Sequence, residues 1–319
     1  MSNFYSKHII HQESNKSRQL LMYKYKFYGI NINSQIAIPF LNVFENFDSQ
    51  QPIVTIELVD DLSFTIKKQI SMGVGIDTQE NVILDIPSIG CYKISDDRIV
   101  IKTYGDTDSQ TLVNFLVSAA VPYFLAKQGK IILRGCSFTS DNQTANLLLG
   151  NSGVGKSTLL AALAKKDCKI LADQFCVLSL IDDKVYIEPA FGYIKLWLQA
   201  TKLLEINNED LLKVRPKLKR FYWQAPFCNK KLLVKNVFKL RTQNLESQSL
   251  LEKVNGIDKI ALIHNNIFAD ELISVDSRTK LEKAKISFKL AAQASFFKIL
   301  NIRAKTTIPE LVELIETNI

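Results

Sequence analysis

Cysteine and histidine are scarce in this chain of 319 residues, which contains only five cysteines and three histidines. The cysteines are odd in number, lie far apart and form no C-x-x-C pair, and three of them fall inside apolar, strand-like runs. Buried, reduced thiols explain this pattern best. His8 and His11 have the spacing of metal ligands, but a loosely ordered terminus explains them better, since no further ligand stands near them. The sequence therefore argues against a disulfide framework and against a zinc site.

Long apolar runs are also scarce. The longest covers residues 112–126 and is interrupted by Asn114, Ser118 and Pro122. It is shorter than the ~20 residues that cross a bilayer, which favours a buried core helix. The first thirty residues are polar and mixed in charge, without the pattern of a secretory signal. We therefore expect a cytoplasmic protein with no membrane partner.

The length of the chain allows two domains, and local patterns change along it. Residues 1–20 predict a polar arm. Residues 21–107 alternate apolar and polar side chains in short runs between turn residues, which predicts a β-rich N-terminal domain. Residues 108–319 predict a domain of strands and helices, with helices over 108–127, 288–300 and 309–316 and a strand over 257–263. The predicted fold class is therefore mixed α/β.

A glycine-rich phosphate-binding motif lies in the second of these parts. It fits G-x-x-x-x-G-K-[ST] and consists of Gly150, Asn151, Ser152, Gly153, Val154, Gly155, Lys156, Ser157 and Thr158. An apolar strand-like run precedes it, and an Ala- and Leu-rich helical segment follows it. In such a unit the loop amides bind phosphates, Lys156 reaches the β- and γ-phosphates, and the Ser157 hydroxyl binds Mg²⁺. The motif predicts a nucleoside triphosphate, with ATP and Mg²⁺ as the expected ligands.

An acidic residue narrows the chemistry that this loop can support. Asp173 follows the apolar residues 170–172, only seventeen residues after Lys156. One helix and one returning strand would bring its carboxylate beside the loop, where it can bind Mg²⁺ or activate a nucleophile near the γ-phosphate. The N-K-x-D motif of GTPases and the signature of ABC-type ATPases are not found in a suitable place. Asp173 and Lys156 are therefore the predicted catalytic residues.

These residues resemble the core of the HPr kinase/phosphorylase family and its HPr-kinase-like relatives. Residues 150–158 match the family's loop, Asp173 matches the first member of its paired-aspartate motif, and residues 133–135 correspond to its His-Gly motif. Weaker likenesses at residues 28–39 and 189–197 extend the resemblance over about residues 23–225. The resemblance implies a phosphoenolpyruvate-carboxykinase-type nucleotide fold over residues 108–319. It also implies phosphorylation of a serine-type hydroxyl on a small protein or peptide, and it allows a homo-oligomer.

Two departures from the family pattern bear on catalysis. Arg134 stands where the family has histidine, and Gln174 stands where it has a second aspartate. The retained Asp173 is the member of the pair that is expected to act as general base. Arg134 is either a clamp on a phosphoryl oxygen, since guanidinium binds phosphate bidentately, or a surface or ion-paired arginine near the site. Glu188 is the nearest later carboxylate that could complete a Mg²⁺ shell with Ser157 and Asp173.

The net charge of +8 is concentrated in one segment, the basic block of residues 213–241. This block contains ten Lys or Arg residues and no Asp or Glu, and aromatic residues lie among the cations, namely Phe221, Tyr222, Trp223 and Phe227. Aromatic side chains between cations suit single-stranded nucleic acid. A flap that closes over the nucleotide and a solvated lysine-rich loop explain the same residues, so three interpretations stay open.

Three classes of function are compatible with these features. The leading prediction is a kinase of the HPr-kinase-like type, which transfers the γ-phosphoryl group of ATP to a serine-type hydroxyl. The alternative is a catalytically degenerate ATP-binding module, which would account for the residues found at positions 134 and 174. The third is a nucleic-acid-associated ATPase that uses the basic block.

Overall fold

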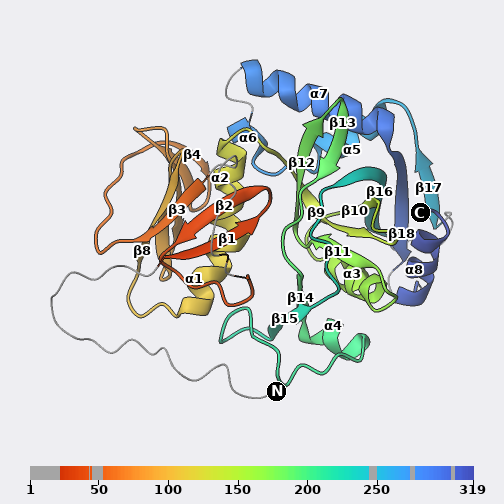
Figure 1. Ribbon diagram of the computed structural model, residues 1–319, viewed down its shortest axis with the longest axis horizontal. Helices are drawn as coiled ribbons and strands as arrows, with labels where there is room; N and C mark the ends of the chain where they lie inside the picture. Colours follow the sequence, from red (N-terminus) through yellow and green to blue (C-terminus); the bar gives the residue numbers. More distant parts are fainter. Residues whose placement is uncertain (1–21, 43, 45–52, 244–249, 274–276, 303–305) are drawn as a thin grey trace.

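The computed structural model describes residues 22–42, 44, 53–243, 250–273, 277–302 and 306–319. These residues form two eight-stranded sheets and a two-stranded ribbon, with helices between and around them (Figure 1). This arrangement confirms the mixed α/β class and the β-rich character of the N-terminal part. The predicted polar arm of residues 1–20, with His8 and His11, lies outside the described residues.

The N-terminal sheet has the strand order β1-β2-β3-β8-β7-β6-β5-β4. Its strands are β1 (Tyr23–Phe27), β2 (Ile30–Ser34), β3 (Ile53–Leu58), β4 (Ile66–Ser71), β5 (Val74–Asp77), β6 (Val82–Ile86), β7 (Gly90–Ile94) and β8 (Arg98–Thr103). Strand β3 pairs in parallel with β2 and β8, and the other neighbours are antiparallel. Ile99 and Ile101 of β8 are fully buried, because alternate residues of a strand face the same side. The sheet thus presents an apolar face to the helix that follows it.

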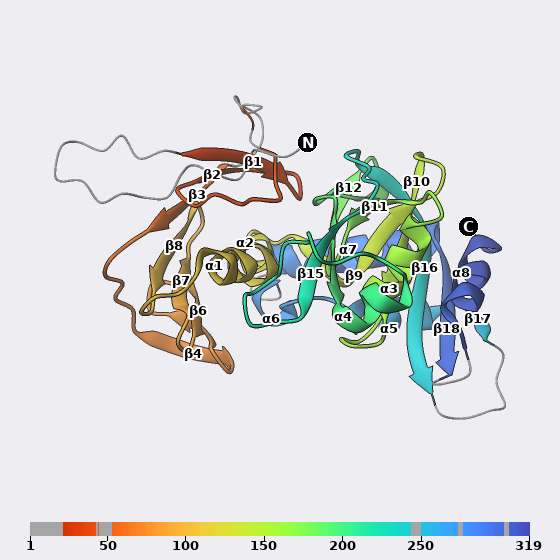
Figure 2. The same cartoon turned by 90° about the horizontal axis from the view of Figure 1, so that it is seen from below.

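One helical segment lies between the two sheets (Figures 1 and 2). It consists of α1 (Ser109–Phe115), the π-helical turn η1 (Leu116–Ala120) and α2 (Val121–Lys127), which confirms the predicted helix apart from its π turn. Asp108 caps it by accepting a hydrogen bond from the Thr111 amide. By length and composition, residues 109–127 form the one helix among the described residues that could cross a membrane. In its most apolar stretch of 18 residues, 61% is buried inside the protein. It therefore serves as a core helix here.

The C-terminal sheet has the order β10-β9-β12-β13-β16-β18-β17, with β11 beside β9. Its strands are β9 (Ile131–Thr139), β10 (Thr144–Leu149), β11 (Lys169–Ala172), β12 (Phe175–Ile181), β13 (Lys184–Ile187), β16 (Leu232–Gln243), β17 (Leu251–Val254) and β18 (Ser295–Ile302). Helices α3 (Lys156–Ala164) and α8 (Ile308–Glu316) cover one face, and α5 (Ile257–His264) and α7 (Ser277–Gln293) cover the other (Figure 1). Val237 and Phe238, neighbours on β16, belong to the apolar clusters on opposite faces.

Two local predictions in this half of the chain are wrong. Residues 257–263 form helix α5 rather than a strand. Residues 288–300 divide between the end of α7 and β18, and the change comes at Ala294. A short apolar run does not by itself distinguish a buried strand from a buried helix. The secondary structure of each segment therefore depends on the residues, distant in the sequence, against which it packs.

The two sheets are joined through a ribbon and a cluster of aromatic rings. The ribbon pairs β14 (Tyr193–Trp197) with β15 (Arg220–Gln224), and the short helix α4 (Leu198–Leu203) lies between them in the chain. A second short helix, α6 (Asp270–Ile273), follows α5. The ring of Phe40 lies 5.3 Å from that of Phe191 and 4.5 Å from that of Tyr222, measured between centroids. The Tyr28 amide donates to the Pro189 carbonyl oxygen at 2.8 Å. Segments 28–39 and 189–197, which carry the weaker family likenesses, therefore contact each other.

Candidate functional site

The phosphate-binding motif folds into a loop between a strand and a helix. Strand β10 ends at Leu149, and α3 begins at Lys156. Gly155, directly before the helix, has a φ of 101°, where a residue with a Cβ would be strained. Gly150 meets a different requirement, because a Cβ there would lie 2.8 Å from the carbonyl oxygen of Leu240. The loop therefore ends at a helix N-terminus, whose unpaired amides and dipole attract anions.

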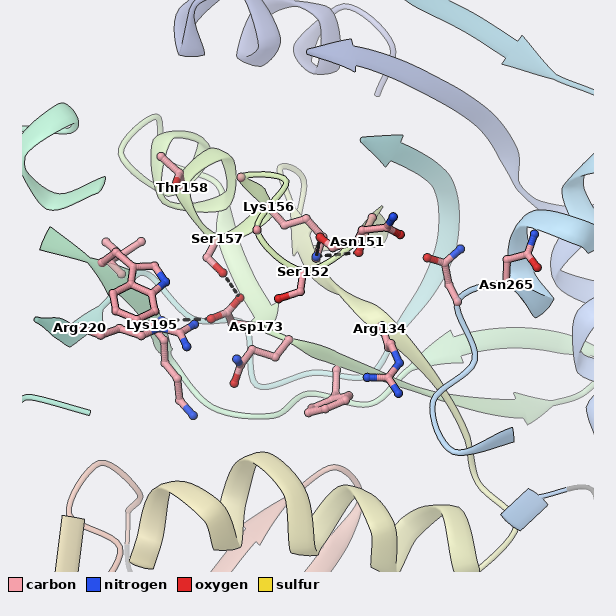
Figure 3. A pocket seen from close by; sticks show the side chains of 18 residues that line it. Arg134, Asn151, Ser152, Lys156, Ser157, Thr158, Asp173, Lys195, Arg220 and Asn265 are labelled. Atoms are coloured by element: carbon pink, nitrogen blue, oxygen red, sulfur yellow. Dashed lines mark hydrogen bonds between the residues drawn. The ribbon is translucent and has the colours of Figure 1, made fainter. Parts of the chain in front are cut away.

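A cavity of about 690 Å³ lies against this loop, and Figure 3 shows the side chains that line it. The loop and the first turn of α3 supply one group of lining residues, and β9, β14, β15, the turn after β11, the start of β12 and the segment after α5 supply the others. Its size falls within the range of small-molecule sites in proteins. Its charged lining residues, among those that the structure describes, are Arg134, Lys156, Lys195, Arg220 and Asp173. Four cations and one carboxylate make the cavity suited to a polyanion.

Lys156 lies across the loop inside this cavity. Its Nζ atom donates hydrogen bonds to the carbonyl oxygens of Gly150, at 2.7 Å, and Asn151, at 2.9 Å. Its ammonium group therefore lies over the same backbone that would surround a phosphate group. Lysine in this position acts as a compact charge with three donors, which suits the bridging oxygens of a triphosphate.

Asp173 and Ser157 meet in the cavity, as their spacing in the sequence predicts. The Ser157 hydroxyl donates to Oδ1 of Asp173 at 2.9 Å, and the Cys136 thiol donates to the same oxygen at 3.2 Å. The Lys195 amide donates to Oδ2 at 3.0 Å. Asp173 is only 5% exposed, so these three neutral donors replace much of its hydration. Burial and the nearby Asp173 raise the pKa of Cys136, so its sulfur stays a thiol and donates.

Gln174 also lines the cavity, at the position where the family has a second aspartate. Its backbone is left-handed, with a φ of 78°, and its carbonyl oxygen accepts a hydrogen bond from the Gly135 amide at 3.0 Å. A residue without glycine's freedom is costly in this conformation, and such residues collect at functional sites. The strained turn holds the residue after Asp173 against the cavity.

Arg134 lies at the opposite side of Asp173 from Arg220 (Figure 3). Its guanidinium carbon is 4.8 Å from the centroid of the Phe268 ring, and its amide donates to the Asn266 carbonyl oxygen at 2.7 Å. The side chain is exposed, and no carboxylate among the described residues forms an ion pair with it. An exposed arginine without an ion pair is compatible with both interpretations that the sequence leaves open, the phosphoryl clamp and the surface arginine.

Glu188 does not reach the cavity, and the expectation that it completes a metal shell needs correction. It is 8% exposed, and its Oε1 atom accepts from Lys231 Nζ at 2.7 Å. The chain after β13 carries it to the contact between the two sheets, where Gly29 lies against its side chain. No group of three or more His, Cys, Asp or Glu residues within the described ranges could hold a metal ion. Ser157 and Asp173 alone fit Mg²⁺, which usually takes one or two protein oxygens together with phosphates and water.

Lys195 is a cavity residue that the sequence reasoning missed. It is 3% exposed in the middle of β14, and its Nζ atom donates to Oδ1 of Asn114 at 2.9 Å and to the Ser118 hydroxyl. Burial lowers the pKa of Lys195 to about 7, and the charge of Arg220 lowers it too, whereas Asp173 raises it. The one signal in the sequence was a single lysine inside the apolar run YIKLW.

The basic block of residues 213–241 does not form one continuous surface. Arg220 lines the cavity, Arg215 lies over the ring of Phe115, and Lys231 forms the ion pair with Glu188 described above. Much of the block belongs to strands β15 and β16. Its cations therefore have separate surroundings, and Arg220 is the member of the block that belongs to the site.

Comparisons with known proteins add a distant structural likeness. No protein-family model matches the sequence, and no curated protein matches it. Among solved structures, the HPr(Ser) kinase/phosphatase from Coxiella burnetii matches 58% of this chain and 91% of its own chain. The two sequences are 15% identical over the match, and the TM-score is 0.30. The likeness is one of distant structure only.

Proposed function

We propose that the chain binds a nucleoside triphosphate with Mg²⁺ at the loop of residues 150–158 and transfers its γ-phosphoryl group to a serine-type hydroxyl of a protein or peptide. The observation that carries this proposal is the contact between Asp173 and Ser157 inside the cavity. It sets a buried carboxylate beside the hydroxyl that is expected to bind the metal ion. Phosphoryl transfer needs mainly positioning and charge stabilisation, and the loop, Lys156 and this carboxylate supply both.

The residues of the site have separate tasks in this reaction. Ser157 and Asp173 would hold Mg²⁺, which when bound would offset negative charge on the phosphates. Lys156 exchanges its two carbonyl acceptors for phosphate oxygens, and the loop amides bind beside it. Asp173 accepts the proton of the acceptor hydroxyl as that oxygen bonds to the γ-phosphorus. The bond from the γ-phosphorus to the bridging oxygen breaks, and the nucleoside diphosphate leaves.

The substitution Asp173→Asn tests the proposal, because it keeps the shape of the side chain and removes the base. We expect transfer of ³²P from [γ-³²P]ATP to serine-containing peptides and proteins to fall by about 10²–10⁴-fold, the usual contribution of a general base. Equilibrium binding of ATP in the absence of Mg²⁺ should persist, because the loop amides and Lys156 are unchanged; its enhancement by Mg²⁺ should weaken, because Asp173 is also a proposed ligand of the ion. Asp183→Asn is the matched control, since Asp183 is an exposed carboxylate in the β12–β13 turn, with a φ of 59° that asparagine tolerates. Wild-type protein that transfers no label to any acceptor would overturn the kinase proposal.

A catalytically degenerate ATP-binding module is the second candidate, and Gln174 favours it. This amide lines the cavity where a second carboxylate would help to bind metal and substrate. If the chain is such a module, wild-type protein should bind ATP with Mg²⁺ in calorimetry but form no ADP and no phosphorylated product. Gln174→Asp then restores ADP formation, whereas a working kinase already shows it in the wild type.

A further inference from the structure

The cavity wall formed by β14 and β15 carries a cation to which the mechanism above gives no task. We propose that Arg220, held in place by Trp197, is a clamp that binds the γ-phosphoryl group of the triphosphate at the Asp173 end of the cavity. This inference rests on the proposed function of the site. It assigns a specific residue of the basic block to the phosphate ligand.

The register of the ribbon brings the two side chains together. Trp197 and Arg220 are directly opposite each other in the antiparallel pair of β14 and β15, and opposite residues share a face. The guanidinium carbon of Arg220 lies 5.3 Å from the centroid of the Trp197 ring. Contact with an aromatic face restrains the plane of the guanidinium group. Trp197 is 49% exposed, so its ring forms part of the cavity wall rather than the core.

Arg220 is half-buried and lacks the acceptors that an arginine in such a position normally has. Its Nε atom is buried and has no hydrogen-bond partner, and no carboxylate among the described residues forms an ion pair with it. Buried donors in native proteins are nearly always satisfied, so an unsatisfied one on a cavity wall indicates a missing acceptor. Burial lowers the pKa of Arg220 and the charge of Asp173 raises it, but arginine stays protonated in proteins. The cavity therefore contains a charged donor that is free to bind an anion.

A phosphoryl group is the anion that fits this position. The Nε and Nη donors of arginine form a planar fork that matches two phosphate oxygens. Arg220 interacts electrostatically with Asp173, the residue expected to take the proton of the acceptor hydroxyl as it attacks the γ-phosphorus. Arg134 lies on the other side of Asp173 (Figure 3), and its guanidinium carbon lies 4.8 Å from the centroid of the Phe268 ring. The γ-phosphoryl group carries the charge that must be stabilised during transfer, so a fork beside Asp173 meets it there.

Binding of two nucleotides distinguishes a specific contact of Arg220 with the γ-phosphate from a general contribution of its charge to nucleotide binding. We expect Arg220→Met to weaken binding of the non-hydrolysable triphosphate AMP-PNP with Mg²⁺ by about tenfold or more, because charge-assisted hydrogen bonds are lost. Binding of ADP with Mg²⁺, which lacks the γ-phosphate, should change by less than about threefold. Arg215→Met is the matched control, since Arg215 also lies on an aromatic ring, that of Phe115, but outside this cavity. Arg220→Lys should recover part of the AMP-PNP affinity, because the charge stays and the fork is lost.

Trp197 supplies a second readout that does not depend on turnover. In a Trp223→Phe background Trp197 is the single tryptophan of the chain. AMP-PNP, but not ADP, should change its emission, and the added Arg220→Met substitution should abolish that change. Equal effects of Arg220→Met on both nucleotides, or none on either, would overturn the clamp and leave the proposed function standing. If the methionine variant loses its native circular dichroism, Arg220→Lys carries the comparison. Wild-type protein that binds neither nucleotide would overturn the proposed function and the clamp together.

Discussion

The two ends of the cavity are built in different ways. At one end, strands β11, β14 and β15 bury Asp173 and Lys195, and backbone hydrogen bonds fix both residues. At the other end, the exposed Arg134 rests on the ring of Phe268. The first end, here called the closed end, is held in place by strand pairing. The second, here called the open end, is held by the contact between the Arg134 side chain and the Phe268 ring.

This contrast separates two requirements of group transfer. Fixed charges and dipoles act more strongly where water is excluded, because the effective dielectric constant is lower there. The closed end, with Asp173 and Arg220, therefore suits the reacting phosphorus. The open end, where Arg134 reaches solvent, suits the approach of a large acceptor.

The largest expected effect concerns the closed end and its buried lysine. A buried lysine with a pKa of about 7 binds fewer protons than the unfolded chain between pH 7 and about 10.5, so the free energy of unfolding rises with pH in that range. Below pH 7 the buried charge costs on the order of 5 kcal/mol, because burial lowers the pKa of Lys195 from its ordinary value of 10.5 to about 7. Lys195→Met should therefore stabilise the protein most at pH 6–7, and the gain over wild type should shrink toward pH 10.

Urea unfolding of the wild type and the Lys195→Met variant between pH 6 and 10 measures this difference. The surface substitution Lys230→Met is the control for loss of a lysine as such. A stability difference that stays constant with pH would show that Lys195 is not desolvated in solution. The closed end of the cavity would then be wetter than its packing indicates, and the contrast between the ends would weaken.

The sequence predicts the part of the site that is local in the chain. Strand, loop and helix follow one another within residues 144–164, and Asp173 returns beside them after one more strand. Glu188 fails as a prediction because nothing local indicates that the chain after β13 turns toward Lys231. Lys195 depends on contacts much farther away, since its ammonium group binds Asn114, 81 residues earlier. Arg220 enters the cavity only through the pairing of β15 with β14.

The fold shows the same division between local and remote information. The alternating pattern of the N-terminal strands and the cap at Asp108 are local, and they were predictable. The helical state of residues 257–263 is not, because the same apolar run suits a buried strand equally well. The π turn at Leu116–Ala120 is also invisible in the sequence, although it holds Ser118 against Lys195.

An intermediate effect is expected from truncating the aromatic residue at each end. Phe268 is 5% exposed, and its ring lies 4.8 Å from the rings of Tyr123 and Phe175, so Phe268→Ala should cost about 3–5 kcal/mol. Trp197 is about half exposed, and Trp197→Ala should cost about 1 kcal/mol or less. Urea unfolding at pH 7 measures both.

The comparison is sharpened by nucleotide binding to the same two variants. The exposed ring of Trp197 should matter more for AMP-PNP affinity than for stability, because its contact is with Arg220. Phe268→Ala should reduce stability more than it reduces AMP-PNP affinity. A loss of stability as large for Trp197→Ala as for Phe268→Ala would mean that the ribbon is part of the core rather than a wall of the cavity.

The smallest effect concerns two serine hydroxyl groups, that of the half-buried Ser118 beside Lys195 and that of the fully buried Ser287. The Ser118 hydroxyl accepts from Lys195 Nζ and donates to Oδ1 of Asn114 at 3.3 Å, so Ser118→Ala removes an acceptor from a buried charge. We expect a loss of about 1–2 kcal/mol at pH 6, shrinking above pH 7 as Lys195 loses its proton. Ser287→Ala is the matched control, because the Ser287 hydroxyl is fully buried and has no hydrogen-bond partner, so its removal should be neutral or slightly stabilising. Equal losses for the two serine variants at pH 6 would mean that the π turn does not support the ammonium group, and the closed end would owe its order to the strands alone.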